Sequence, residues 1–228
     1  MAGANETVGK EDVKKFIIQH RYLQNPRQWP SGSGATVVLG RVKIEFNNAG
    51  HDEFIHDTGI FKNDENHHSE KYFLDFLKAK LDALEGTVTQ VIVNLVQNYS
   101  PCSDCVTRIL EFVDGQDFRL TFTIKFANFY KHYYNRNRES MKLLLQKGIR
   151  LQLLQGESAW KEFLDDKTFV KLNTRGERQE ILNLAKTKER KDREKDDVAI
   201  LKKIECEVFG KKVFSTDDLV HQTQHLQL

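Results

Sequence analysis

Residues 87–105 read TVTQVIVNLVQNYSPCSDC, and this stretch decides the fold class. Its first part, Thr87 to Gln97, is an almost continuous apolar run, which is typical of a strand buried on both faces of a sheet. Its second part begins a helix at Pro101, because proline fits the first helical position and Ser100 can cap that helix. The stretch therefore predicts a buried strand that leads directly into a helix, the repeating unit of α/β sheets.

The remaining segments alternate in the same way. We expect further strands over residues 36–46, 51–61, 118–127 and 149–154, and helices over residues 11–23, 67–84, 101–112, 136–146, 159–169 and 175–204. The last two strands are separated by about twenty residues, a length that a hairpin does not need and a parallel crossover does. The order predicts a three-layer α/β/α domain with six to seven helices and a five-stranded mixed sheet, whose last two strands are parallel.

Length and composition are those of a globular protein. The chain has 228 residues, of which 39% are hydrophobic and 30% charged, enough for one compact domain. We expect a flexible N-terminus over residues 1–10, a single domain over residues 11–205 and a tail over residues 206–228. The 35 basic and 33 acidic residues nearly balance, so a nucleic-acid partner has to be recognised by a local patch rather than by the whole protein.

The sequence gives no sign of a membrane span or of a secretory signal, because it lacks an apolar run of 18 residues and a charged-then-apolar start. Its cysteines are Cys102, Cys105 and Cys206, an odd number that cannot form a disulfide framework. We therefore expect a protein of a reducing compartment, the cytoplasm or the nucleus, that is not secreted.

The sharpest motif consists of His68-Ser69-Glu70 followed by Pro101-Cys102-Ser103-Asp104-Cys105. Zinc prefers imidazole nitrogen and thiolate sulfur, and a catalytic zinc has three protein ligands and one open position. The two cysteines, three residues apart in a first helical turn, lie on one side of the helix, whose N-terminus favours thiolates. We expect one catalytic zinc ion bound by His68, Cys102 and Cys105, with Glu70 left to transfer protons.

Other readings of these residues are weaker. A Cys-x-x-Cys pair can be a redox motif or half of a zinc finger, but Cys206 stands alone and supplies no second pair. His67 adjoins His68, and the spacing to Glu70 selects His68 as the ligand. The pattern H-x-E…P-C-x-x-C is the signature of zinc deaminases, which attack C4 of cytosine or C6 of adenine with a zinc-activated water.

Several segments between residues 11 and 204 resemble the AID/APOBEC family of polynucleotide cytosine deaminases. The segments are Asn98-Tyr99-Ser100-Pro101-Cys102, Gly59-Ile60-Phe61-Lys62-Asn63, Asn25-Pro26-Arg27-Gln28-Trp29 with Thr36, Ala127-Asn128-Phe129-Tyr130, and Trp160-x-x-Phe163. The resemblance implies a cytidine-deaminase-like fold. Two features depart from the family pattern, since Tyr99 stands where the family has tryptophan, and the usually basic first loop reads Ser31-Gly32-Ser33-Gly34.

The resemblance also implies roles in substrate binding. Asn63 would contact the target nucleotide, and Thr36 would line its pocket. The family's pocket tyrosine corresponds to Phe129, or to Tyr130 if the alignment shifts by one residue. Ser100 and Trp29 complete the expected substrate-binding set, with stacking on a base and anchoring of the loop as equal alternatives for Trp29.

Basic and aromatic residues alternate between residues 125 and 150. The basic residues are Lys125, Lys131, Arg136, Arg138, Lys142, Lys147 and Arg150, against the single acid Glu139. The aromatic residues are Phe126, Phe129, Tyr130, Tyr133 and Tyr134. This mixture indicates a track for a single strand, with Lys125, Lys131, Arg136 and Arg138 on its phosphates. In the alternative, some aromatics belong to the core and the charges form a solvated helix face. The mixed charges over residues 186–197 favour an exposed, salt-bridged helix face.

Together these features predict a zinc-dependent cytosine deaminase that acts on single-stranded DNA and converts cytosine to uracil by hydrolysis. RNA is the alternative substrate, and a zinc-containing nucleic-acid-binding protein without turnover is the alternative class, which the presence of Glu70 disfavours. Free-nucleoside deaminases share the zinc motif, but the crossover before residue 149 and the late helices disfavour that reading. The sequence does not indicate an oligomeric state.

Overall fold

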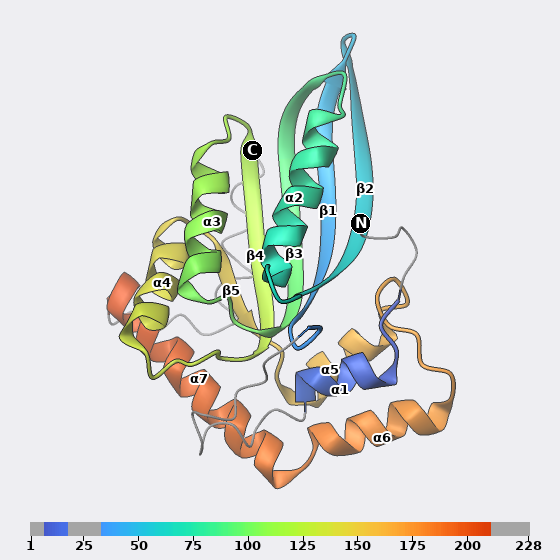
Figure 1. The fold of residues 1–228 in the computed structure, drawn as a ribbon, viewed down its shortest axis with the longest axis vertical. Helices are drawn as coiled ribbons and strands as arrows, with labels where there is room; N and C mark the ends of the chain where they lie inside the picture. The colour runs from blue at the N-terminus through green and yellow to red at the C-terminus, as the bar shows by residue number, and fades with distance from the viewer. Residues whose placement is uncertain (1–6, 18–32, 211–228) are drawn as a thin grey trace.

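The computed structural model describes residues 7–17 and 33–210 (Figure 1). Trp29 and the segment Asn25–Trp29 lie outside the described residues, as does the second half of the helix expected over residues 11–23. No helix within the described ranges combines the length and the apolar character that a membrane crossing requires.

A five-stranded mixed sheet forms the centre of the molecule. Its strands are β1 (Val37–Asn48), β2 (His51–Lys62), β3 (Thr87–Tyr99), β4 (Arg119–Asn128) and β5 (Arg150–Leu153), in the order β2-β1-β3-β4-β5. β1 pairs antiparallel with β2 and β3, whereas β3, β4 and β5 run parallel. The predicted sheet, with its last two strands parallel, is confirmed.

Helices cover both faces of the sheet (Figure 1). The helices are α1 (Lys10–Ile17), α2 (Ser69–Asp82), α3 (Ser103–Asp114), α4 (Asn135–Gln146), α5 (Gly156–Asp165), α6 (Arg175–Ala185) and α7 (Lys188–Phe209). α2, α3 and α4 pack on one face, while α1, α5 and α6 pack on the other. α7 contacts α6, β4 and α4, and so links the two layers. The predicted α/β/α architecture is confirmed.

Each face of the sheet buries its own apolar core. The first core includes Phe73 and Leu77 of α2 against Val93 of β3, and the second includes Trp160 of α5. Gly40 of β1 lies under the ring of Phe73, where an added Cβ atom would meet a ring carbon at 2.7 Å. Glycine at this position therefore lets α2 approach the sheet closely. Two residues of the candidate site lie in or next to the first turn of this helix.

The start of α3 differs from the expectation. α3 begins at Ser103, with Cys102 as its N-cap and no side-chain cap, so the predicted capping role of Ser100 is wrong. The backbone of Ser100 instead continues the strand, since its N–H donates to the carbonyl of Asn128 at 2.8 Å. Its hydroxyl accepts a hydrogen bond from the N–H of Tyr130 at 2.9 Å. Ser100 therefore ties the ends of β3 and β4 together.

The single helix expected over residues 175–204 is also wrong, because two helices occupy this segment. Thr187 caps the second, α7, and its hydroxyl accepts a hydrogen bond from the N–H of Arg190 at 3.3 Å. The prediction of an exposed, salt-bridged face fails for Arg190, Arg193 and Asp197, each of which is only 1% exposed. They are paired inside the protein, Arg190 with Glu194 and Arg193 with Asp197, although Nη1 of Arg193 is buried without a hydrogen-bond partner among the described residues.

The expected segment boundaries fall inside or beside regular structure. Val8, placed in the flexible N-terminus, bridges Val170 and is buried, and α1 begins at Lys10. At the other end α7 runs past the expected boundary at residue 205 to Phe209. Both segments therefore contribute packing to the domain.

Candidate active site

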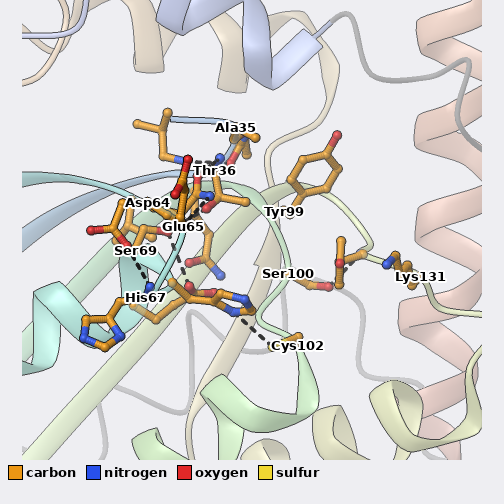
Figure 2. A pocket seen from close by; sticks show the side chains of 18 of the residues that line it. Ala35, Thr36, Asp64, Glu65, His67, Ser69, Tyr99, Ser100, Cys102 and Lys131 are labelled. Atoms are coloured by element: carbon orange, nitrogen blue, oxygen red, sulfur yellow. Dashed lines mark hydrogen bonds between the residues drawn. The ribbon is translucent and has the colours of Figure 1, made fainter. Parts of the chain in front are cut away.

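The candidate site is a cavity of about 280 Å³ at one end of the sheet (Figure 2). It lies where β2, β3 and β4 end and where α2 and α3 begin. Parallel strands place the loops after their carboxyl ends at one edge of the sheet, which is where α/β proteins bind ligands. The lining includes Thr36, Asn63, His68, Glu70, Ser100, Cys102, Tyr130 and Lys131.

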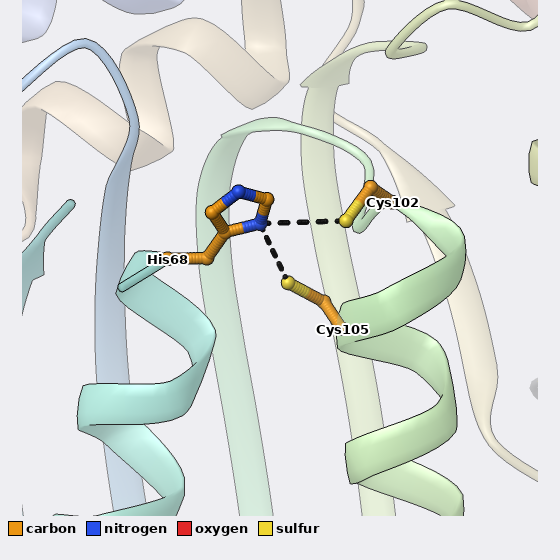
Figure 3. A group of neighbouring side chains, drawn as sticks. All are labelled: His68, Cys102 and Cys105. Carbon is orange, nitrogen blue, oxygen red and sulfur yellow. Dashed lines mark hydrogen bonds between the residues drawn. The ribbon is translucent and has the colours of Figure 1, made fainter. Parts of the chain in front are cut away.

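His68, Cys102 and Cys105 meet beside this cavity (Figure 3). His68 is the residue before α2, Cys102 caps α3, and Cys105 lies in its first turn. The Nδ1 atom of His68 lies 3.1 Å from Sγ of Cys105 and 3.4 Å from Sγ of Cys102, and all three donor atoms are within 4.8 Å of one another. A nitrogen and a sulfur on a tetrahedral zinc ion are about 3.6 Å apart, so the donor set fits one zinc ion.

The two cysteines share a proton in the metal-free geometry. A hydrogen bond from Cys105 lowers the pKa of Cys102 to about 4, and the same contact raises the pKa of Cys105. The hydrogen bond to Cys102 also raises the pKa of His68. A divalent cation would allow both sulfurs to be thiolates, because it replaces the shared proton.

Glu70 lines the same cavity from the first turn of α2 and is only 7% exposed. Burial raises the pKa of its carboxyl group above the usual 4.5. The hydroxyl of Ser69 donates to Oε2 of Glu70 at 3.3 Å and lies 3.1 Å from the hydroxyl of Thr36. Thr36, Ser69 and Glu70 therefore form a hydrogen-bonded row along the cavity wall.

Asn63 and Thr36, for which the resemblance implies contact with the target nucleotide, lie together at the cavity. Oδ1 of Asn63 accepts a hydrogen bond from the N–H of Thr36 at 2.7 Å, and the N–H of Asn63 donates to the carbonyl of Thr36 at 3.3 Å. These contacts join the start of β1 to the end of β2. The two side chains are therefore held in fixed positions relative to each other.

Asp64 and Tyr72 shape the loop before His68, and sequence reasoning missed both. The hydroxyl of Tyr72 donates to Oδ2 of Asp64, while Oδ1 of Asp64 accepts from the N–H groups of Asn66 at 2.8 Å and His67 at 2.7 Å. The hydrogen bond from Tyr72 is the main reason why the pKa of Asp64 is lowered. The aspartate followed by two polar residues was the available signal, because such side chains often bond to nearby backbone N–H groups.

Of the two alternatives for the pocket aromatic, the structure brings Tyr130 to the cavity. Phe129 instead packs in the core, 2% exposed, with its ring centroid 4.9 Å from that of Phe126. The ring of Tyr130 contacts that of Tyr99 at 5.9 Å, and Nζ of Lys131 lies 5.0 Å from its centroid.

The residues expected on a phosphate track are separated by the fold. Lys131 lines the cavity, and Arg136 lies on α4, paired with Asp104 of α3. Arg138 also lies on α4 and donates to the side chain of Asn135. Lys125 lines another cavity, beside α5, so the structure does not bring it to the candidate site. Successive side chains of a strand point to opposite faces, which places Lys125 opposite its buried neighbours in the first core.

Residues 34–182, more than half of the chain, match the model of the APOBEC3 cytosine deaminase domain. This chain belongs to that family. The APOBEC3 match spans the whole sheet, His68, Glu70, both site cysteines and Tyr130, and it ends within α6. Helix α7 lies beyond the matched residues.

One curated relative is the DNA dC->dU-editing enzyme APOBEC3 of Rattus norvegicus. The two sequences are 25% identical over 111 residues, which are 47% of this chain and 26% of the rat protein. The aligned part therefore spans about a quarter of the length of that relative.

Proposed function

We propose that this protein catalyses the zinc-dependent hydrolytic deamination of cytosine to uracil in single-stranded DNA. The observation that carries the proposal is the convergence of His68, Cys102 and Cys105 to within 4.8 Å beside the buried carboxyl group of Glu70. Membership of the cytosine deaminase family and the DNA-editing activity named for the rat relative support the same reaction.

His68, Cys102 and Cys105 would hold the single zinc ion. Zinc bound there supplies a Lewis acid that makes water a nucleophile near neutral pH. The carboxylate of Glu70 would accept a proton as water adds to C4 of cytosine and pass it to the ring nitrogen N3. It would then take the proton of the new C4 hydroxyl and deliver it to the amine, as the C4–N bond breaks and the C4 carbonyl forms. Water and cytosine are consumed, and uracil and ammonia are formed.

The raised pKa of Glu70 suits this role, because it moves the carboxyl group toward neutral pH, where one group can both accept and donate a proton. Ser69 fixes one carboxyl oxygen through its hydroxyl. Other groups that line the cavity would bind the base, namely Thr36, Asn63, Ser100 and Tyr130. Trp29 keeps its proposed substrate contact as an expectation, since it lies outside the described residues.

A single strand is the favoured substrate form, because C4 of a paired and stacked base cannot be reached. Lys131 at the cavity and Arg136 and Arg138 on α4 would contact phosphates beside the target base. Tyr133 and Tyr134 are 40% and 54% exposed, with ring centroids 4.6 Å apart, and offer stacking surfaces next to the cavity loop. The odd number of cysteines, Cys102, Cys105 and Cys206, favours a reducing compartment, the cytoplasm or the nucleus.

The test is uracil formation in a labelled single-stranded DNA that contains one cytosine, read by uracil excision and strand cleavage. We expect product with the wild-type protein and a loss of about 10²–10⁴-fold in kcat for Glu70→Gln, the range that general acid–base groups contribute. Glu53→Gln, at an exposed position of β2, is the matched control and should remain active. A matched RNA strand tests the alternative substrate. Strand binding with bound zinc but without product would contradict the proposal.

A further inference from the structure

Helix α7 places three charged side chains in the protein interior. Arg190, Arg193 and Asp197 are spaced so that they lie on one face of the helix, and each is 1% exposed. Buried charges are rare unless they are paired and hydrogen-bonded. In this helix, the buried side chains bind the backbone at the end of β4 and one another.

Both arginines reach the end of β4. Nη2 of Arg190 donates to the carbonyl of Ala127 at 2.8 Å, and its Nη1 donates to Oδ1 of Asn128 at 2.7 Å. Nη2 of Arg193 donates to the carbonyl of Phe129 at 2.8 Å. β5 pairs with β4 only over Thr123–Phe126, so these three residues lie beyond the end of that pairing.

Asp197 completes the contacts. Its Oδ2 accepts from Nε of Arg193 at 2.7 Å, and its Oδ1 accepts from the N–H of Phe129 at 3.4 Å. The backbone of Phe129 is thus held on both sides by one buried ion pair. Tyr130 is the next residue, and its ring lines the cavity.

A second connection runs from Arg190 to the residues on either side of Thr36. The side-chain amide of Asn128 donates to the carbonyl of Asn98 at 2.9 Å. The side chain of Asn98 in turn accepts from the N–H of Val37 at 2.9 Å and donates to the carbonyl of Ala35 at 2.9 Å. Val37 and Ala35 flank Thr36 in the chain, so α7 is connected through hydrogen bonds to the neighbours of two cavity-lining residues, Tyr130 and Thr36.

We propose that Arg190, Arg193 and Asp197 are positioning residues of this active site, which fix the end of β4 and thereby the place of Tyr130 against the target base. The contact of Tyr130 with the base rests on the proposed function, whereas the positioning of the loop does not. Because α7 lies outside residues 34–182, this role is a property of the chain beyond the matched family domain.

The test uses a double variant, Arg193→Met with Asp197→Leu, which removes the ion pair without leaving a buried charge unpaired. Such replacements are often neutral for stability, so this protein should still fold. We expect amide hydrogen exchange at Phe129 and Tyr130 to become about tenfold faster than in the wild type, because the local opening of this loop no longer breaks the ion-pair contacts. Lys191→Gln removes a charge from the exposed face of the same helix and should leave exchange unchanged.

A double-mutant cycle tests whether the effect passes through Tyr130. We expect the double variant to lower kcat/KM about tenfold in the wild-type background and less than about twofold in a Tyr130→Ala background, since coupled residues are not additive. A full effect in the Tyr130→Ala background, or unchanged exchange at Phe129, would overturn the proposal.

The proposal can also be tested if the double variant does not fold or if the wild-type protein forms no uracil. If the double variant does not fold, Arg193→Lys tests the positioning of the loop in its place. This variant keeps the charge but loses the forked donors that reach both Asp197 and Phe129. The rate of amide exchange at Phe129 should therefore still rise. If the wild-type protein forms no uracil, the proposed function fails. Hydrogen exchange would then still test the positioning of the loop.

Discussion

At the scale of single residues, the proposed chemistry depends on Glu70, a carboxyl group that is buried and would have to ionise. Its burial costs free energy whenever it is charged, because water can no longer solvate the carboxylate. The protein retains this cost at the position where proton transfer is proposed. Stability and function therefore place opposite demands on the same side chain.

Glu70→Gln should stabilise the zinc-free protein at pH 7. Burial raises the folded-state pKa above 4.5, so the stability of the wild type is fully present below pH 4.5, where the group is neutral in both states, and is lost as the pH rises through the folded pKa. Glu70→Gln has no carboxyl group to ionise at this position, so it does not lose this stability as the pH rises. Thermal unfolding from pH 4 to pH 8 should show a higher midpoint for the variant at pH 7 and convergence below pH 4.5. A gap that widens on acidification would contradict the sign.

The convergence of His68, Cys102 and Cys105, the proposed zinc ligands, could be predicted from the sequence because the signature H-x-E…P-C-x-x-C links them and each lies at a helix start. His68 and Cys102 directly precede α2 and α3, and Cys105 follows one turn later. The pocket aromatic could not be assigned, because a one-residue shift at the end of a strand exchanges the core-facing Phe129 for Tyr130. In the structure the hydrogen bond from Tyr130 to Ser100 and the contacts of Phe129 with Arg193 and Asp197 fix that register.

At the scale of elements, the division between α6 and α7 depends on a single threonine. Thr187→Ala removes the side-chain acceptor for the N–H of Arg190 and should lower the free energy of unfolding by about 1 kcal/mol. Urea unfolding measures this loss. Thr174→Ala, at the N-cap of α6, removes the equivalent bond to Glu177 at 3.1 Å and is the matched comparison. A loss for Thr174→Ala with none for Thr187→Ala would show that α7 does not need its cap.

Local patterns explain why most elements, but not this division, could be predicted. The strands and helices up to residue 165 follow the alternation of apolar runs and amphipathic stripes. The two residues between α6 and α7 are Lys186 and Thr187. Neither is a glycine or a proline, so no helix-breaking residue marks the end of α6. The dense charges of α7 predicted solvent exposure. Arg190 and Arg193 are buried instead, because they donate to backbone groups at the end of β4. These partners lie about sixty residues earlier in the chain, so the local charge pattern could not indicate them.

At the scale of the whole molecule, zinc would connect two helices that lie side by side on the first face of the sheet (Figure 1). His68 belongs to the start of α2, and both cysteines belong to the start of α3. A ligand that binds only the folded state stabilises it by about 2.7 kcal/mol at a hundredfold excess over its Kd. The ion is thus expected to contribute to folding as well as to chemistry.

Removal of zinc by a chelator should therefore lower the thermal midpoint of the wild-type protein. Cys105→Ser lacks one sulfur ligand, so its midpoint should be lower from the start and should respond little to the chelator. Thermal unfolding of both proteins, with and without chelator and with zinc added back, measures this difference. An equal response of the two proteins to the chelator would place the zinc elsewhere.

X-ray absorption at the zinc edge of the purified protein tests the shared metal most directly. We predict one tightly bound zinc ion per chain with two sulfur neighbours at about 2.3 Å and nitrogen or oxygen neighbours at about 2.0–2.1 Å. The absence of stoichiometric zinc, or a shell of four sulfurs or of none, would contradict a centre formed by His68, Cys102 and Cys105.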